Sequence, residues 1–276
     1  MELRVNSATP HEGSAMPDES ALPHKSDPKA NRFLATLQPE DYDALMAVAR
    51  IVPMKFRKRI MRQDEPVDAV YFPLTCMFSL FITSGEKPLM ALATIGNEGV
   101  FGAVEVFQKQ GSMGMALIQL AGDAVRVEAA AFLKTAGDRP PIQRLIYQDL
   151  YVLLRKILFN AACHRLHSME ARCARWLLMT QDRAAQDTFP LTQEFMSHTL
   201  GVRRATVNVA IGTLKKAGFI HYVRGHITVS DRRGLESVAC DCYQAVNNLY
   251  LSSFASLHEA KPPRASPLSR GSSAPK

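Results

Sequence analysis

The segment between residues 191 and 229 constrains the fold most strongly. A short helical pattern follows Thr192, a glycine stands at position 201, and a second helical pattern opens with the arginine pair 203–204. Two short β-rich runs then occupy residues 220–229. A short helix, a glycine-containing turn and a basic second helix are typical of a helix-turn-helix. The sequence therefore predicts a winged helix-turn-helix, whose partner would be duplex DNA.

The local chemistry of the first helix agrees with this prediction. Thr192 can cap the helix, and Glu194 places negative charge in its first turn. Phe195 and Leu200 contribute to an apolar side. Gly201 permits the positive φ that a sharp turn between helices often needs.

The second helix has one apolar and one polar face. The apolar stripe has helical spacing and consists of Val207, Ala210, Ile211 and Leu214. On the opposite face Arg204 and Asn208 lie one turn apart, and these residue types can bind guanine and adenine through paired hydrogen bonds. The predicted DNA contacts are Thr192, Gln193, Arg203, Arg204, Thr206, Asn208, Lys215, Arg224 and His226. The alternative is an ordinary amphipathic helix pair with a solvated basic face, which the basic-tipped hairpin at 222–229 disfavours.

Charge is concentrated in the same part of the chain. The protein has 33 Lys and Arg against 26 Asp and Glu, a formal net charge of +7. Residues 165–233 hold 11 Lys and Arg against 5 Asp and Glu. A localised basic surface is what a protein that binds the phosphate backbone requires. A membrane-surface role would need a basic helix with a large apolar face, which the sequence lacks.

Length and composition indicate a globular cytoplasmic protein. With 276 residues, 47% of them hydrophobic, the chain can bury a sizeable core. Residues 1–29 are polar and contain no apolar segment of a signal peptide, and no run has the roughly 18 apolar residues of a membrane span. Five unevenly spaced cysteines favour reduced thiols in a cytoplasm.

Periodicity divides the chain into an α+β arrangement. Short β-rich runs about ten residues apart predict a β-sandwich or barrel, and a long helical pattern follows at 142–166. We predict disordered tails at 1–30 and 259–276, a β-roll sensor-like domain at 31–138, a dimerisation helix at 139–163, a winged helix-turn-helix at 164–236 and a C-terminal helix at 237–258.

The long helix has more apolar residues than one packing face needs. One apolar line contains Ile146, Leu150, Leu153, Ile157 and Asn160, and a second contains Leu145, Val152 and Phe159. Two such lines suggest packing against both the β-roll of the same chain and a second copy of the helix. The alternative is a helix buried within one subunit.

This order of elements resembles the cyclic-AMP receptor protein/FNR (Crp/Fnr) superfamily of bacterial transcription regulators. The resemblance covers roughly residues 33–240 and is most specific at 191–194, 200–207 and 214–220. It implies a β-roll (jelly-roll, cyclic-nucleotide-binding-like), a homodimer joined through the long helix, and half-sites about 34 Å apart on DNA. It also implies Arg204 as a guanine reader, Thr206 as a phosphate contact and RNA polymerase as a further partner.

The sequence departs from the familiar family pattern both in the recognition helix and in the β-roll. Ala205 replaces the glutamate and Val209 the second arginine of the recognition helix, so the preferred DNA sequence should differ from that of the cyclic-AMP receptor protein. In the β-roll, Ala103 replaces the carboxylate that holds the ribose, and the phosphate loop has no arginine. A buried phosphate would lack a cation, which argues against cyclic AMP. Candidate contacts for another small-molecule effector are Gly102, Glu105, Ser112 and Met113.

The cysteines and histidines form no recognisable metal motif. No cysteine precedes Cys76, which excludes an N-terminal iron–sulfur cluster of the FNR type. Cys163, His164 and His167 lie close enough on one helix for a metal site or a redox switch, and Cys163 and His167 share a face. Packing and hydrogen bonding at the helix end is the preferred interpretation. Cys240 and Cys242 are expected on different faces of a helix, without a second pair. We therefore predict no metal and no cofactor.

Three functional classes compete for this sequence. The leading hypothesis is a dimeric, sequence-specific DNA-binding regulator. The alternative is a ligand-binding or interaction module with a vestigial winged helix, against which the polar face containing Arg204 and Asn208 argues. An enzyme is not expected, because the sequence has no nucleotide-binding glycine loop and no recognisable nucleophile–base pair.

Overall fold

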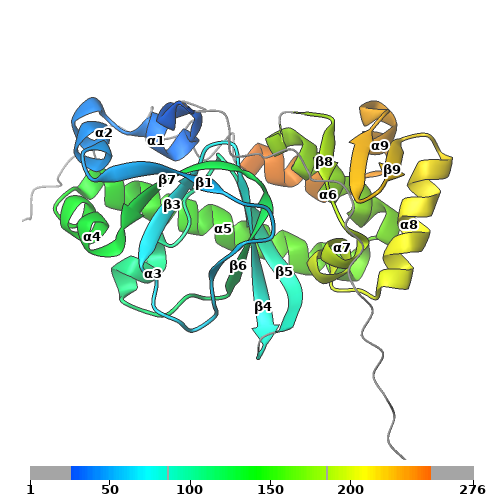
Figure 1. Cartoon of the computed structure of the whole chain (residues 1–276), viewed down its shortest axis with the longest axis horizontal. Helices are drawn as coiled ribbons and strands as arrows, with labels where there is room; N and C mark the ends of the chain where they lie inside the picture. Colours follow the sequence, from blue (N-terminus) through cyan, green and yellow to red (C-terminus); the bar gives the residue numbers. More distant parts are fainter. Residues whose placement is uncertain (1–25, 86, 185, 250–276) are drawn as a thin grey trace, which may run out of the picture.

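The computed structural model describes residues 26–85, 87–184 and 186–249 (Figure 1). The described chain begins with a short 3-10 helix, η1 (Pro28–Ala30), followed by α1 (Arg32–Thr36) and α2 (Pro39–Met46). Asp27 caps η1 by accepting a hydrogen bond from the backbone N–H of Lys29. The predicted disordered tail at 1–30 is therefore wrong for residues 28–30. Residues 1–25 and the predicted tail at 259–276 lie outside the described residues.

Two antiparallel sheets form the β-roll. The strands are β1 (Ala49–Met54), β2 (Arg59–Met61), β3 (Ala69–Pro73), β4 (Met77–Ser84), β5 (Lys87–Ile95), β6 (Met115–Leu120) and β7 (Gly122–Glu128). One sheet has the order β1-β7-β3 and the other β2-β6-β4-β5. Side chains from both sheets fill the interior, where the rings of Phe78 and Phe101 stack with centroids 5.3 Å apart. The β-rich runs of the sequence thus form the predicted β domain, and the α+β fold class is confirmed.

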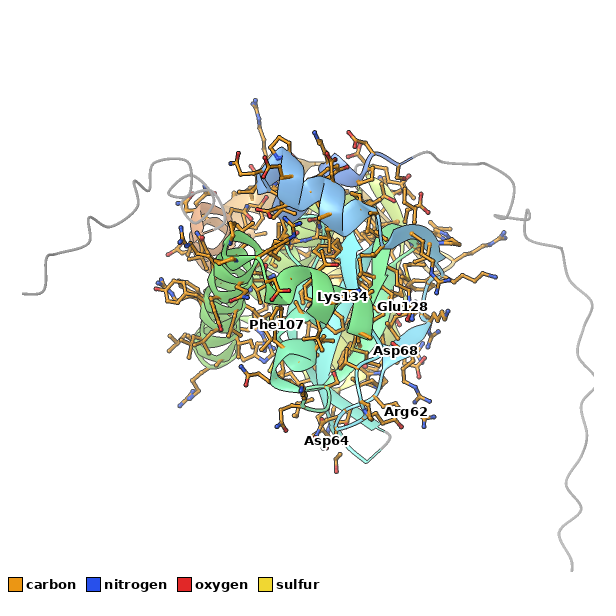
Figure 2. All side chains as sticks on the ribbon, turned by 90° about the vertical axis from the view of Figure 1, so that its left-hand side faces the viewer. Arg62, Asp64, Asp68, Phe107, Glu128 and Lys134 are labelled. Carbon is orange, nitrogen blue, oxygen red and sulfur yellow. The ribbon has the colours of Figure 1, made fainter. Side chains whose placement is uncertain are left out.

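Two helices cover one end of the β-roll. The helix α3 (Ala103–Gln108) follows β5, and α4 (Ala129–Gly137) follows β7. They pack on each other through the edge of Phe107 against Phe132, with ring centroids 5.7 Å apart. Figure 2 views this end of the molecule and labels Phe107 on α3 and Lys134 on α4. No separate pattern predicted α3, because six residues are too few to show a helical period.

The long helix α5 (Pro140–Leu166) runs from α4 along the β-roll to the other half of the molecule (Figure 1). Its face toward the β-roll buries Ile142, Leu145, Ile146, Val152 and Leu153. Both apolar lines expected from the sequence therefore contribute to packing within the subunit. The exposed line is a different one, formed by Tyr147, Tyr151, Leu154 and Leu158.

The second half is helical with a small sheet. It contains α6 (Met169–Ala184), β8 (Thr188–Pro190), α7 (Gln193–Leu200), α8 (Arg204–Lys216), β9 (Ile220–Val223), β10 (His226–Val229) and α9 (Arg232–Val238). The sheet order is β8-β10-β9, so the expected strand pair has a third strand. The C-terminal helix expected at 237–258 is interrupted: α9 ends at Val238, and helical structure resumes at residues 242–249. None of the helices within the described ranges has the length and apolar character of a bilayer-crossing segment.

The two halves share one hydrophobic core. Phe195 of α7 packs edge-on against Phe81 of β4, with centroids 6.0 Å apart, and lies 6.4 Å from the ring of Phe56. A Cβ added at Gly201 would lie only 3.1 Å from the Cγ of Met90 on β5. The helix-turn-helix therefore rests directly on the β4–β5 hairpin.

Candidate nucleic-acid interface

The turn between α7 and α8 has the predicted geometry. The hydroxyl of Thr192 accepts a hydrogen bond from the backbone N–H of Phe195 (3.1 Å) and so caps α7. Gly201 has φ +63°, and its N–H donates to the carbonyl of His198. These two local interactions fix where α7 begins and ends, and they set the angle at which α8 leaves the turn.

The inner face of α8 is the predicted apolar stripe. Val207, Ala210, Ile211 and Leu214 are all buried in the core that α8 shares with α6 and α7. This packing prevents α8 from rotating about its own axis. Its opposite face is therefore held in a fixed orientation toward solvent (Figure 1).

The outer face of α8 is polar and basic. Arg203, Arg204, Thr206 and Asn208 are all exposed. The side chains of Arg203, Arg204 and Asn208 form no hydrogen bond or ion pair among the described residues. Val209 is 67% exposed beside them. The first turn of α8 contains no acidic residue, so the positive end of the helix dipole is uncompensated.

The wing adds a second basic element. The turn between β9 and β10 consists of Arg224 (φ +46°) and Gly225 (φ +79°), and two successive positive φ angles are typical of a type I′ hairpin. The carbonyl of Gly225 accepts a hydrogen bond from the N–H of Leu191 (2.7 Å), which ties the wing tip to the strand leading into α7. Arg224 and His226 are exposed at this tip. Lys215, in the last turn of α8, is also exposed.

The remaining two predicted contacts lie at the start of α7. Thr192 and Gln193 are both partly exposed. The oxygen of Thr192 already accepts the capping hydrogen bond, but its hydroxyl proton is still available to a phosphate oxygen. All nine predicted DNA contacts thus belong to α7, α8 or the wing and its flanks.

The four candidate effector contacts lie around α3. Gly102 (φ +86°) precedes the helix, and the Ser112 hydroxyl donates to the carbonyl of Gly114 (2.7 Å) in a buried position. Burial raises the pKa of Glu105, although hydrogen bonds from its own N–H and that of Met113 oppose the shift. The pocket beside Gly102, Glu105 and Met113 has room for about one water molecule.

Arg126 does not supply the missing phosphate cation. Its guanidinium pairs with Asp68 (3.4 Å) and with Glu128, and it donates to the hydroxyl of Tyr71. Hydrogen bonds from this guanidinium lower the pKa of the exposed Glu128. Asp68 and Glu128 lie next to each other in Figure 2. The charge of Arg126 is therefore already neutralised by neighbouring carboxylates.

A buried charged network joins the two halves. Glu98, in the loop after β5, accepts hydrogen bonds from Arg183 of α6 (2.6 and 3.1 Å) and lies 3.4 Å from the ammonium of Lys156 on α5. Burial alone would raise the pKa of Glu98, but the charges of Arg183 and Lys156 lower it. Burial also raises the pKa of the neighbouring Asp149 to about 7 and lowers that of Lys156 to about 8.

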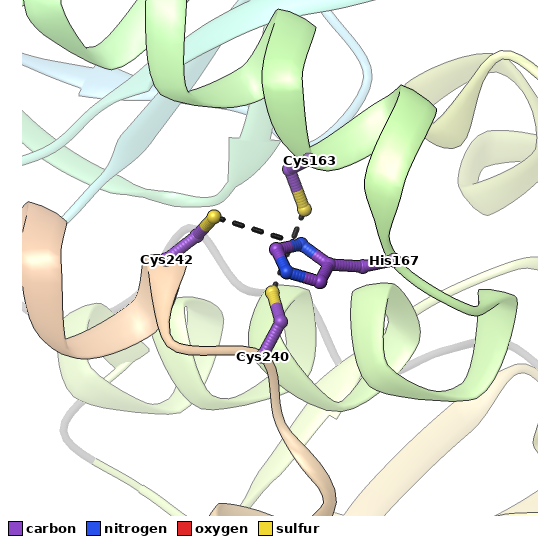
Figure 3. Close-up of side chains that lie close together, drawn as sticks. All are labelled: Cys163, His167, Cys240 and Cys242. Carbon is purple, nitrogen blue, oxygen red and sulfur yellow. Dashed lines mark hydrogen bonds between the residues drawn. The ribbon is translucent and has the colours of Figure 1, made fainter.

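Sequence reasoning paired Cys163 with His167 but did not predict that Cys240 and Cys242 would join them. Cys163, His167, Cys240 and Cys242 lie together, with their ligand atoms all within 4.8 Å of one another (Figure 3). The prediction placed Cys240 and Cys242 on different faces of one helix. In the structure Cys240 lies in the non-helical segment after α9, and Cys242 begins the helical residues 242–249. Because the two cysteines are not on one continuous helix, both thiols can face the end of α5. A separation of 77 positions between Cys163 and Cys240 left no local pattern to detect.

Comparison with known proteins supports the same architecture. Residues 171–238 match the family model of the Crp-like helix-turn-helix domain. A CRP-like cAMP-activated global transcriptional regulator of Mycobacterium tuberculosis is 24% identical over 183 residues, which cover 64% of this chain and 82% of the relative. At this identity the relative's response to cAMP remains a property of that protein.

Two solved structures have a similar fold. FixK2 from Bradyrhizobium japonicum has a TM-score of 0.58 and 19% identity, and the match covers 70% of this chain and 98% of FixK2. A CRP/FNR-family transcriptional regulator from Thermus thermophilus has a TM-score of 0.57 and 20% identity, with 69% and 98% covered. These similarities establish the arrangement of β-roll, long helix and winged helix-turn-helix.

Proposed function

We propose that this chain, which carries a Crp-like helix-turn-helix domain and has the fold of Crp/Fnr regulators, is a transcription regulator that reads duplex DNA through α8. One observation carries the proposal. Arg204 and Asn208 lie one turn apart on an exposed face, without partners among the described residues, while the opposite face of the same helix is held in the core. Buried packing on one face and unpaired base-reading groups on the other are what a recognition helix needs.

The side chains divide into two roles. Arg204 and Asn208 project from the outer face of α8 and are assigned to base edges. Arg203, Thr206 and Arg224 lie at the start of the helix and on the wing, where they suit phosphates. Thr192, Gln193, Lys215 and His226 extend this phosphate-binding surface around the helix-turn-helix.

The functional unit we propose is a homodimer that reads an inverted repeat. Tyr147, Tyr151, Leu154 and Leu158 recur along α5 at spacings of four, three and four residues, and each side chain is at least 52% exposed. An exposed apolar line with this heptad spacing matches the seam of a two-helix coiled coil. Pairing two α5 helices would place two α8 helices at half-sites about 34 Å apart on DNA.

Regulation would act through the contact between the halves. Ala103 stands where the ribose carboxylate would be, and Arg126 is already paired with Asp68 and Glu128, so we propose an effector other than cyclic AMP. Such an effector would act by moving the β4–β5 hairpin, on which Phe195 and Gly201 rest. It can do so only if it binds the two arrangements with different affinity. RNA polymerase is the further partner we propose, and the cytoplasm the location, since a regulator acts where the chromosome is transcribed.

The test is selection of bound sequences from a random duplex library with purified ligand-free protein, followed by affinity measurements at several salt concentrations. We expect an enriched inverted repeat. Arg204→Ala should cost about 1–3 kcal/mol on the selected site and relax the preference at one base pair. Arg203→Ala should weaken binding to all duplexes and reduce the salt slope by about 0.9.

Arg233→Ala is the matched control, because Arg233 is also exposed but lies on α9, outside α7, α8 and the wing. It should leave both affinity and preference unchanged. Equal losses for Arg203→Ala and Arg204→Ala on selected and random DNA would refute the division of roles. No enrichment from the library, with or without metabolite extract, would refute the proposal itself.

A further inference from the structure

Four potential metal ligands converge where α5 ends. Cys163 lies in the last turn of α5, and His167 is its C-terminal cap residue. Cys240 and Cys242 come from the segment after α9. The three thiols are buried and the imidazole is partly buried. Figure 3 shows the four side chains pointing toward one central point.

The spacing of these atoms fits one tetrahedral ion. The Sγ atoms of Cys163 and Cys240 are 3.5 Å apart, and the Sγ of Cys242 is 3.7 Å from the Nδ1 of His167. A tetrahedral zinc with Zn–S of about 2.3 Å and Zn–N of about 2.0 Å places neighbouring ligand atoms roughly 3.5–3.8 Å apart. Two of the six ligand-atom pairs already lie at this separation, and all six lie within 4.8 Å, so a contraction of about 1 Å at most would enclose an ion.

The surrounding charge also suits such an ion. Three thiolates and one neutral imidazole around Zn²⁺ would carry a net charge of −1. The buried Arg175 of α6 lies close enough to act electrostatically on all three cysteines. Its guanidinium donates to the side-chain oxygen of Asn160, while its Nε has no hydrogen-bond partner among the described residues. A buried cation beside the cluster would offset the negative charge.

We propose that Cys163, His167, Cys240 and Cys242 bind a single Zn²⁺ in a closed structural site. Soft thiolates and imidazole are the ligands that zinc prefers, and Cys3His is a familiar set for structural zinc. All four positions are taken by protein side chains, so the ion has no open position for catalysis. An iron–sulfur cluster distributes its cysteines over several iron atoms, whereas these four ligand atoms surround one point.

The position of the site gives the ion a mechanical role. His167 ends α5 with extended backbone angles, and α6 begins two residues later. The ion would tie this bend to the segment that follows α9, and so join both ends of the helix-turn-helix half to the long helix. If the proposed DNA-binding function holds, zinc would stabilise the orientation of α8 relative to α5.

The experiment is metal analysis of the full-length protein purified under reducing conditions, by inductively coupled plasma mass spectrometry. We expect about one zinc per chain. After removal of zinc with a chelator, Co²⁺ should bind with the absorption of a tetrahedral thiolate complex. Cys240→Ser and Cys242→Ser should lose the zinc, and the chelator should lower the melting temperature of the wild-type chain only.

The matched control is Cys173→Ala, which alters another buried cysteine on α6 outside the cluster and should retain the zinc. Circular dichroism identifies any variant that fails to fold, and for such a variant His167→Gln, at a partly exposed ligand, serves in its place. Absence of both zinc and cobalt binding by the folded reduced protein would overturn the proposal. Iron with acid-labile sulfide, or a Cys163–Cys240 disulfide in place of metal, would also overturn it.

Discussion

Replacing Glu98 by glutamine removes the negative charge that both Arg183 and Lys156 contact in the buried network. Glutamine has almost the same shape, so no cavity is created. The side chains of Arg183 and Lys156 are only 8% and 5% exposed, and Lys156 would keep Asp149 as a nearby counter-charge. Removing one partner of a buried ion pair typically costs about 3–5 kcal/mol. We expect Glu98→Gln to lower the free energy of unfolding by about 3 kcal/mol, the lower end of that range. The loss is moderated because Asp149 ionises more readily once Glu98 no longer repels it.

The assay is urea unfolding followed by the fluorescence of Trp176, the single tryptophan, which is buried in α6. The control is Glu65→Gln, which removes an exposed partner of Arg62 and should cost less than about 1 kcal/mol. The double variant Glu98→Gln/Lys156→Met should regain part of the lost stability, since it removes one of the two buried cations together with the carboxylate. If Glu98→Gln cost no more than Glu65→Gln, the network would not stabilise the joint.

The same network predicts a pH dependence. The folded pKa of Glu98 lies below its unfolded value, so its contribution is present above roughly pH 4.5 and is lost as the pH falls toward the folded pKa. The folded pKa of Asp149 is raised to about 7, so the folded chain keeps a proton that the unfolded chain releases. This difference in bound protons lowers the free energy of unfolding as the pH rises from roughly 4 to 7. Asp149→Asn should flatten this decline in urea titrations across that range; an unchanged slope would show that Asp149 titrates normally.

Three further predictions concern the interface and the dimer. Leu154→Glu should convert the proposed dimer to a monomer in sedimentation velocity, whereas Leu89→Glu, similarly exposed on β5, should not. A monomeric wild type would contradict this. Arg224→Asn should reduce the salt slope of DNA binding by about 0.9, because one phosphate contact is lost. Its melting temperature should stay unchanged or rise, because asparagine tolerates the positive φ at this position better than arginine. A lower melting temperature would contradict the second expectation. Gly201 has φ +63°, so Gly201→Ala should lower the free energy of unfolding in urea by about 1–2 kcal/mol. Gly212 lies inside α8 with open space at its Cβ, so Gly212→Ala should raise it by roughly 0.5–1 kcal/mol. Equal effects of the two substitutions would refute the argument from backbone conformation.

Short-range patterns in the sequence were enough to predict the helix-turn-helix. The cap at Thr192, the positive φ at Gly201 and the buried stripe that begins at Val207 each depend on residues within one or two helical turns. Such interactions have almost the same geometry in any tertiary context, so their sequence patterns are specific. The resemblance to Crp/Fnr regulators rests on the same segment, which the Crp-like family model also matches.

The exposed face of α5 could be assigned only from the tertiary structure. Apolar residues occur on nearly every side of this helix, so its periodicity does not indicate which line faces the β-roll. The sheets and α4 bury Leu145, Ile146 and Leu153, which leaves the line through Tyr151 and Leu154 exposed. Strand β8 was missed for a related reason: its three residues become a strand only by pairing with β10, some 40 positions later.

The joint between the halves depends on contacts even more distant in the chain. Glu98 meets Arg183 across 85 positions, and Cys163 meets Cys240 across 77. Neither pair leaves a local pattern, because a buried ion pair or a ligand set requires only that the side chains meet in space. The sequence alone thus determined the local elements and the exposed basic face of α8, where neighbouring residues decide the structure. Folding decided which face of α5 stays exposed and brought two distant pairs of potential metal ligands together.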